Sequence, residues 1–525
     1  MPAQPLGPFS YKFGGWKPDR PHLVNPVFPP NMEEYFNGGQ IALTVAQNVI
    51  WTAQGYRPYL PLVGAPALPA TCLGAIAGYD TSGALHVYAG TATDLYSLES
   101  GAWVSRSKVA GGYTATAWSF QVYGACVYAS DGKDPIQTLT MGSGVNFADL
   151  DDTDPAPKAA VLGVIRDFVF AGNLNPGTVG ALPYGVQWSA VANGASWPTP
   201  NTQAAYAAQA GEQTLYPEYG PVMQISDNES FGLLFQRSGI QRCEYVGGNQ
   251  VFQFYTYEKK RGALGQNAVA RVGNKYYFAS PDGFFMTDGN NTTPIGYEQV
   301  DNWFFDNALP EALGFVCAAA DTRNKVIYFA FRSNSPGLTA DGDWSADSDA
   351  TADSYFPLPT VTGDWNANSV ATLGQYFLFD SILAYNYVEQ VWSYCQQPSE
   401  FIFQGLTPDG AWTPFGFTTN HAYGGFSGAP GVATFETIDF NFNQGARAII
   451  TQMRSLSQGT AQMAAASRAR EQDALTWTPF YSGNTRDNVA GLRSEGVYHR
   501  LGVTLAGDFG FSVGATVWPK NAGML

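Results

Sequence analysis

Residues 276–285 are Tyr-Tyr-Phe-Ala-Ser-Pro-Asp-Gly-Phe-Phe, two short apolar runs around a turn that contains Asp282 and Gly283. Apolar runs of this length around an Asp-Gly turn are typical of paired antiparallel strands. The same unit recurs along the chain, and its first apolar strand starts at residues 85, 126, 168, 233, 276 and 326. The steps between these starts are 41, 42, 65, 43 and 50 residues, so four of the five lie near 40 to 50.

A repeat of ~40 to 50 residues with several short strands in each period is typical of propeller blades. One small twisted sheet cannot bury both of its faces until neighbouring sheets stack around an axis. We therefore expect an all-β fold, a β-propeller of about six blades. The alternative is a pair of β-sandwiches, which would also alternate strands and turns but need not keep a common spacing.

The composition agrees with many short strands. The 58 Gly and 33 Pro residues interrupt the chain too often for long helices. The 13 Trp, 29 Tyr and 34 Phe residues provide far more apolar surface than a disordered chain carries. Only 13% of the residues are charged, about half of the roughly 25% found in ordinary soluble proteins. A long chain with so few charges suits large permanent interfaces, so we expect it to be part of an assembly.

Three regions lie outside the repeat and define the expected domains. Residues 1–60 are Pro-rich and are expected to form an extended arm on a surface, because proline lacks the donor that a central strand needs. Residues 61–434 are expected to form the propeller, with an acidic insert at 333–369. Residues 435–525 are expected to form a small β unit that completes or flanks the propeller. Its stretch 462–474 has helix propensity, but alternating apolar residues nearby favour strands.

The net charge of −16 argues against a surface whose task is to neutralise phosphates, so sequence-specific nucleic-acid binding is disfavoured. The five cysteines are widely spread and form no C-x-x-C pair, which indicates buried apolar residues instead of a disulfide scaffold or a zinc site. The N-terminus lacks the pattern of an export signal, and no run of ~18 apolar residues is present. Neither an export signal nor a membrane span is therefore expected.

Motifs for catalysis are missing from the sequence as well. The four histidines include no pair at metal-ligand spacing, and neither a nucleophile-elbow motif nor a phosphate-binding glycine motif occurs. His86 lies in an apolar strand pattern and is expected to be a hydrogen-bonded structural residue. Residues 280–283, Ser-Pro-Asp-Gly, resemble half of the aspartate box of sialidase propellers, but the aromatic residue that closes the box is missing. We expect no enzymatic activity, no cofactor and no metal.

Two clusters of carboxylates remain, and the first consists of Asp149, Asp151, Asp152 and Asp154. The second lies in the acidic insert. It lacks the glycine and the glutamate of a calcium-binding loop, since Ala346 and Ala352 stand at those two places. A solvated loop is the simpler interpretation. Because long inserts are often functional, this loop is also the candidate site for binding a partner, through Asp341, Asp343, Trp344, Asp347, Asp349 and Asp353.

Several segments carry a resemblance to a known family. Residues 48–58 end in Gly-Tyr-Arg-Pro, residues 235–240 are Phe-Gln-Arg-Ser-Gly-Ile, residues 301–305 are Asp-Asn-Trp-Phe-Phe and residues 493–500 are Arg-Ser-Glu-Gly-Val-Tyr-His-Arg. Together with similar short segments between them, they resemble the tail proteins of short-tailed bacteriophages, of the nozzle or packaged-DNA-stabilisation type. The acidic insert departs from the pattern of that family, as does a C-terminus without an obvious fibre-docking domain.

The resemblance implies a structural virion protein of the phage tail, made in the cytoplasm of the host bacterium. Six copies would form a ring, the nozzle, below the portal and adaptor of the head–tail connector, and this ring would retain the packaged DNA and conduct it during ejection. The implied partners are further copies of the chain, adaptor or head-completion proteins, tail fibre or needle proteins, and passing double-stranded DNA without sequence specificity. No catalytic residues come with this family. Carboxylates that face the lumen would repel the phosphates, so DNA would slide without sticking.

A second class of function stays open from the sequence. A monomeric propeller would present a pocket with an aromatic rim to a glycan at the bacterial surface, and would bind or cleave it. Trp103, Trp188 and Trp197 would then serve as stacking platforms, although a tryptophan in a strand is more often part of a core or an interface. Size in solution separates the two classes, since a ring of six weighs about six times the 56.5 kDa of one chain.

Overall fold

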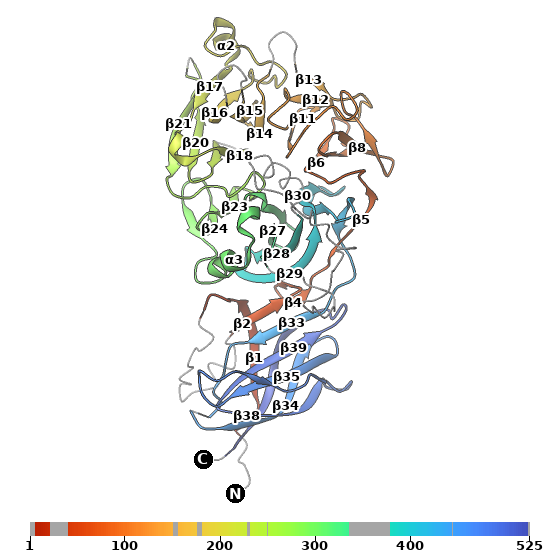
Figure 1. The fold of residues 1–525 in the computed structure, drawn as a ribbon, viewed down its shortest axis with the longest axis vertical. Coiled ribbons are helices and arrows are strands. Elements are labelled where there is room, and N and C mark those ends of the chain that lie inside the picture. The colour runs from red at the N-terminus through yellow and green to blue at the C-terminus, as the bar shows by residue number, and fades with distance from the viewer. Residues whose placement is uncertain are drawn as a thin grey trace, which may run out of the picture.

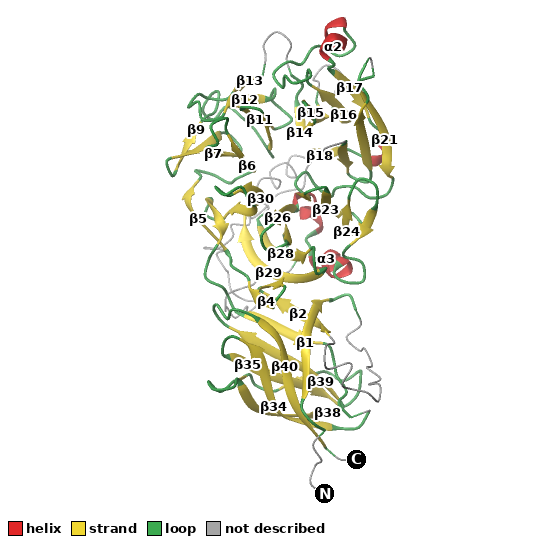
Figure 2. Cartoon of the chain, turned by 180° about the vertical axis from the view of Figure 1, so that it is seen from behind, coloured by secondary structure: helices red, strands yellow, loops and turns green. Residues whose placement is uncertain are grey.

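The computed structural model describes residues 6–20, 40–150, 156–175, 181–227, 231–248, 250–334, 378–443 and 445–522. Strands dominate these residues: a ring of small sheets forms one end of an elongated molecule, and a larger curved sheet forms the other end (Figure 1). Seen from behind, the helices are short and lie on the ring (Figure 2). They include α2 (Gln203–Ala208) and α3 (Asp301–Asn307). None of the helices within the described ranges has the length and apolarity that crossing a membrane requires.

Six separate four-stranded sheets form the blades of a β-propeller, which confirms the all-β propeller fold expected from the repeat (Figure 1). Five of these blades are built from strands that follow one another in the chain: β6 (Gly74–Tyr79), β7 (Leu85–Gly90), β8 (Leu95–Glu99), β9 (Ala102–Ser105); β10 (Ser119–Tyr123), β11 (Cys126–Ser130), β12 (Gln137–Thr140), β13 (Ala148–Asp149); β14 (Ala159–Ile165), β15 (Phe168–Leu174), β16 (Leu182–Trp188), β17 (Gly211–Thr214); β18 (Val222–Asp227), β19 (Gly232–Gln236), β20 (Ile240–Tyr245), β21 (Phe252–Glu258); β22 (Val269–Val272), β23 (Lys275–Ser280), β24 (Gly283–Thr287) and β25 (Thr292–Pro294).

The sixth blade closes the ring with a strand taken from the start of the propeller sequence. It consists of β30 (Phe401–Leu406), β31 (Trp412–Phe417), β32 (Ala422–Phe426) and β5 (Leu62–Ala67). β5 pairs antiparallel with β32, so backbone hydrogen bonds join the two ends of the propeller segment. Gly64 and Gly424 face each other in this pair, and a Cβ atom on either would collide with the backbone of the opposite strand. Only glycine therefore permits this close approach.

A further four-stranded section of the ring belongs to the larger sheet. It consists of β26 (Cys317–Asp321), β27 (Val326–Phe331), β28 (Phe379–Asn386) and β29 (Val391–Ser399). Its first strand contacts both β22 and β30, so the section lies between the fifth blade and the closing blade. The six repeats found in the sequence begin within one residue of β7, β11, β15, β19, β23 and β27, the second strands of successive four-stranded units. None of the six repeat starts lies in the closing blade, whose outer strand is out of sequence order.

The larger sheet continues from this section into a half-barrel, the lower unit. Its strands are β1 (Phe9–Trp16), β2 (Gln40–Gln47), β3 (Val49–Thr52), β4 (Gly55–Pro58), β33 (Ala433–Thr437), β34 (Ala448–Ser457), β35 (Ala461–Arg468), β36 (Thr476–Trp477), β37 (Tyr481–Ser482), β38 (Val489–Gly496), β39 (Tyr498–Leu505) and β40 (Ser512–Asn521). β1 pairs with β2 on one side and with β40 on the other, and β2 also pairs with β33. The N-terminal strands therefore lie between C-terminal strands.

The N-terminal segment is extended, as expected, but its described part is an internal component of this sheet. Phe9, Tyr11 and Phe13 of β1 are buried. The prolines that suggested an arm lie outside the strand, since Pro8 precedes β1 and Pro18 follows it, so every residue of β1 keeps its backbone donor. Residues 1–60 and 435–525 thus contribute to one unit that flanks the propeller, and the Ala-rich stretch 462–474 starts in strand β35 and contains no described helix.

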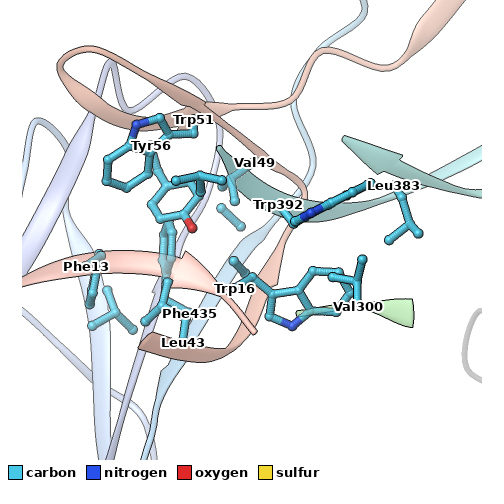
Figure 3. Close-up of a cluster of buried hydrophobic side chains, with 14 of the residues drawn as sticks. Phe13, Trp16, Leu43, Val49, Trp51, Tyr56, Val300, Leu383, Trp392 and Phe435 are labelled. Atoms are coloured by element: carbon cyan, nitrogen blue, oxygen red, sulfur yellow. The ribbon is translucent and has the colours of Figure 1, made fainter. Parts of the chain in front are cut away.

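One hydrophobic core runs from the lower unit into the propeller (Figure 3). On the side of the lower unit, the rings of Phe13 and Phe435 stack with their centroids 4.9 Å apart. On the propeller side, Trp392 from β29 and Leu383 from β28 belong to the same cluster. A buried core shared in this way makes hinge motion between the two parts expensive, because any opening would expose large aromatic rings.

Candidate functional site

The residues expected to bind a partner, Asp341, Asp343, Trp344, Asp347, Asp349 and Asp353, lie outside the described residues. The structure does describe the base of the insert, which connects β27 to β28. Asp380 accepts hydrogen bonds from the backbone amide of Ser333 at 2.9 Å and from its hydroxyl at 2.7 Å. The backbone of Ser333 also forms a β-bridge with Ala308, beside α3. The insert therefore leaves from the section of the ring that continues into the lower unit.

Charge is divided unequally between the two parts of the chain. Residues 61–434 contain 33 acidic and 15 basic residues, a net charge of −18. Residues 1–60 and 435–525 together contain 10 acidic and 12 basic residues, a net charge of +2. The acidity of the protein is thus a property of the propeller and its insert. A polyanion is repelled by the propeller and not by the lower unit.

The first carboxylate cluster is partly described. Asp149 accepts a bond from the Lys108 ammonium at 2.7 Å, and the same ammonium lies 3.7 Å from Asp134. The other members, Asp151, Asp152 and Asp154, lie outside the described residues. Across the described ranges, no group of three or more His, Cys, Asp or Glu side chains is arranged to hold a metal ion. The described part of this cluster forms ion pairs on the propeller surface.

Each of the three described histidines has a hydrogen-bond partner. The Nε2 atom of His86 lies 2.9 Å from the Asp80 carboxylate, which confirms the structural role expected for His86. The Nδ1 atom of His421 pairs with the buried carboxylate of Glu400, whose pKa is raised by burial. His499 donates to a backbone carbonyl at 3.1 Å, and burial lowers its pKa to about 4, so it is neutral at physiological pH.

The four buried cysteines offer no activated nucleophile. All five are free, and four are buried, as the sequence indicated. Burial raises the pKa of the four buried thiols, Cys72, Cys243, Cys317 and Cys395. A thiol whose pKa is raised stays protonated at neutral pH and is a weak nucleophile.

Two of the three tryptophans proposed as glycan platforms are core residues. Trp188 and Trp197 are 6% and 1% exposed. Trp103 is half-buried, packs against Phe417 and Tyr423, and donates to a backbone carbonyl at 3.2 Å. The half aspartate box is a hairpin turn between β23 and β24. These positions do not form an aromatic rim around a pocket.

A carboxylate at the junction of the two parts has a strongly perturbed pKa. Asp301 begins α3 and accepts a hydrogen bond from the amide of Phe284 at 3.0 Å. Burial raises the pKa of Asp301 to about 7, and the nearby charges of Asp19 and Asp282 act in the same direction. Asp19 comes from the N-terminal segment, and its carboxylate accepts from two amides of α3, at 2.9 and 2.7 Å. The N-terminal segment is thereby attached to the propeller through α3.

Replacing Asp301 by asparagine should reduce the dependence of stability on pH. The pKa of Asp301 in the folded protein lies above its ordinary value of 3.8, so its contribution is most favourable below about pH 4 and declines as pH rises through about 7. Asparagine keeps the acceptor for Phe284 but does not ionise. Urea unfolding at about pH 5 and about pH 8 should show a smaller loss of stability in Asp301→Asn than in the wild type. The exposed Asp306→Asn, on the same helix, is the control, and an unchanged pH dependence in Asp301→Asn would contradict this assignment.

Two hollows of the described structure differ in size and in the pairing of their charged groups. The smaller, about 130 Å³, lies on the propeller, and its charged groups are already paired, Arg106 with Glu99 and His86 with Asp80. The larger, about 520 Å³, lies in the lower unit between residues 454–460 and 484–488. The larger hollow was not predicted from the sequence. The sequence does contain one indication of this hollow: residues 484–488, Asn-Thr-Arg-Asp-Asn, read as a polar turn. This turn carries Arg486, one of the two arginines that line the hollow.

No family model matches the chain, and no curated protein matches it. Among solved structures, the chain is similar to one in a crystal structure of the mitotic checkpoint complex, with 8% identity, a TM-score of 0.38, and coverage of 72% of this chain and 93% of that chain. It is also similar to the computationally designed Ika8 protein, with 10% identity, a TM-score of 0.35, and coverage of 70% of this chain and 98% of that chain. Similarities at this level carry no argument about function.

Proposed function

We propose that the chain is a structural subunit of a bacteriophage tail, and that copies of it form a ring of six, a nozzle through which genomic DNA leaves. In this role the protein has no catalytic turnover. The proposal starts from the sequence segments that resemble nozzle proteins. Its main structural support is the single core that joins an acidic propeller to a nearly neutral lower unit.

This construction suits a subunit that bears a mechanical load. A ring around pressurised DNA must resist radial force, and each subunit would transmit that force between its two ends. A continuous aromatic core transmits force without a hinge, because packed interiors have low compressibility. A lumen lined by the acidic propeller would repel the phosphates of passing DNA and favour sliding.

A group of exposed apolar residues at the edge of the closing blade is the proposed contact between copies. Leu60, Val63 and Val432 are 38%, 45% and 54% exposed. They lie on neighbouring segments, since Asn48 binds the carbonyl of Val432 and accepts from the amide of Tyr59. β5, which contains Val63, is the outer strand of its sheet. An open edge beside exposed apolar residues is prone to bind another chain.

The test is the mass and shape of the purified protein. Sedimentation should give about six times 56.5 kDa, and negative-stain electron microscopy should show closed six-fold rings. A double variant Val63→Asp/Val432→Asp should remain folded and monomeric, because it places two carboxylates in the contact. Val145→Asp, at another exposed valine of the propeller, is the control and should keep the ring.

Binding to duplex DNA provides the second readout of the same proposal. At ~50 mM salt, where phosphate contacts are strong, the ring should not retain duplex DNA in a filter assay. A wild-type protein that stays monomeric at every concentration tested would contradict the proposed ring. Tight DNA binding that weakens steeply with salt would contradict the acidic lumen.

A further inference from the structure

The larger hollow of the lower unit has the size of a ligand site. Its volume of about 520 Å³ falls within the ~300–1,000 Å³ typical of pockets for small molecules. Two loops form its walls, residues 457–460 between β34 and β35 and residues 484–488 before β38. Phe511, just before β40, and Val513, in β40, add an apolar side. The hollow thus combines an apolar wall for packing with polar groups that can orient a ligand.

Asn488 holds the two loops together. Its side-chain amide donates to the Ser457 hydroxyl at 3.1 Å and to the Gly459 carbonyl at 2.8 Å, and its side-chain oxygen accepts from the Ala461 amide at 3.1 Å. The backbone φ of Asn488 is 58°, a left-handed conformation that asparagine tolerates better than most residues. The walls of the hollow are therefore fixed before any ligand arrives, which lowers the entropic cost of binding.

The charged groups of the hollow favour an anion. Arg454 and Arg486 both line it and are exposed, and neither forms an ion pair with any residue in the described part of the chain. Four other arginines of the lower unit, Arg447, Arg468, Arg493 and Arg500, do form such pairs. Asp487 is the one carboxylate among the lining residues, so the hollow carries a net positive charge. Free guanidinium groups match the geometry of carboxylate and phosphate ligands.

The remaining polar groups favour a ligand rich in hydroxyls. Gln458, Thr460, Asn484 and Thr485 line the same hollow and supply donors as well as acceptors. A hydroxyl group on a ligand can use both kinds of partner at once. We propose that this hollow binds a hydroxyl-rich anion of the size of one or two sugar units, such as an acidic saccharide. The site lies in the lower unit and not in the propeller, and the inference does not depend on ring formation.

Calorimetric titration of the full chain with three probes tests the site. Digalacturonate supplies carboxylates, glucose 1-phosphate supplies a phosphate, and maltose supplies hydroxyls without charge. At least one of the two anionic probes should bind saturably, and maltose should bind at least about tenfold more weakly, because charge-assisted bonds to arginine are lost. The preferred anionic probe identifies the source of the charge as a carboxylate or a phosphate.

Variants locate the binding in the hollow. The double variant Arg454→Gln/Arg486→Gln should bind the preferred anion about tenfold or more weakly. Arg493→Gln on β38, a 79% exposed arginine outside the hollow, is the matched control and should bind as the wild type does. Far-UV circular dichroism establishes that each variant is folded. The proposal is overturned if neither anion binds at up to ~10 mM, if maltose binds equally well, or if the double variant keeps full affinity.

Discussion

Replacing Asp439 by alanine is expected to lower the free energy of unfolding by about 3–5 kcal/mol. The carboxylate of Asp439 is 1% exposed and pairs with two guanidinium groups. One oxygen accepts from Nε of Arg500 at 2.9 Å, and the other contacts Arg468. The two arginine side chains are themselves only 12% and 14% exposed. Removing the carboxylate leaves two largely buried positive charges without their main partner.

The size of this effect follows from what remains after the substitution. Glu436 also pairs with Arg500, but at 3.9 Å, and burial raises the pKa of Glu436. It therefore compensates only weakly for the lost charge. Asp439→Asn keeps the shape and one acceptor but loses the charge, so an intermediate loss is expected. The cluster connects β35 and β39 to the segment that follows β33.

Equilibrium unfolding in urea, followed by far-UV circular dichroism, measures the loss. Glu471→Gln is the control, because this carboxylate is exposed and accepts one hydrogen bond, from Tyr498. The control should stay within about 0.5 kcal/mol of the wild type. A loss of less than about 1 kcal/mol in Asp439→Ala would show that water or Glu436 satisfies both arginines.

The propeller was predictable because its repeat is local. Each four-stranded unit places apolar residues at its second strand, and the starts at 85, 126, 168, 233, 276 and 326 coincide with these strands to within one residue. The closing blade was not predictable from this pattern. Its outer strand β5 pairs with β32, about 360 residues later in the chain, and no local spacing records such a contact.

The place of the N-terminal strand shows a second limit. Prolines at 5, 8, 18 and 21 indicated an arm, because proline disfavours a central strand. Between Pro8 and Pro18, however, Phe9, Tyr11 and Phe13 alternate with less apolar residues, which is the pattern of a strand with one buried face. The high proline content of residues 1–60 thus obscured the alternating pattern of the eight-residue strand β1. The alternation within the strand predicts the structure better than the composition of the whole segment does.

The candidate sites depend on contacts between distant residues, and this is why the sequence predicted them poorly. Arg454 and Arg486 are 32 residues apart and meet around one hollow only because β34 and β38 pair. The perturbed pKa of Asp301 arises from burial and from Asp19, which is far away in the chain. By contrast, the structural role of His86 was predictable, since its partner Asp80 is six residues away across one hairpin.

The second large effect is expected at Trp392, where the propeller meets the lower unit. This side chain is fully buried. Its ring lies 4.6 Å from that of Tyr385 and 5.1 Å from that of Phe284, measured between centroids, and its Nε1 donates to the carbonyl of Ile295 at 2.9 Å. Figure 3 shows it in the same cluster as Trp16 of the N-terminal strand. The residue thus connects β28, β24 and the segment before α3 to the shared core.

Trp392→Ala should lower the free energy of unfolding by about 3–5 kcal/mol, because it removes a large buried ring and leaves a cavity that the surrounding strands cannot fill. It also removes the shorter of the two side-chain hydrogen bonds to the Ile295 carbonyl, which leaves only the 3.4 Å bond from Gln299. Trp412→Ala, a 41% exposed tryptophan on β31, is the matched control and should lose less than about 1 kcal/mol. If the two parts share one core, urea unfolding of Trp392→Ala should shift the signals of both parts together. A variant in which the propeller melts early while β34 and β40 keep their amide-exchange protection would show that the core is divided at this residue.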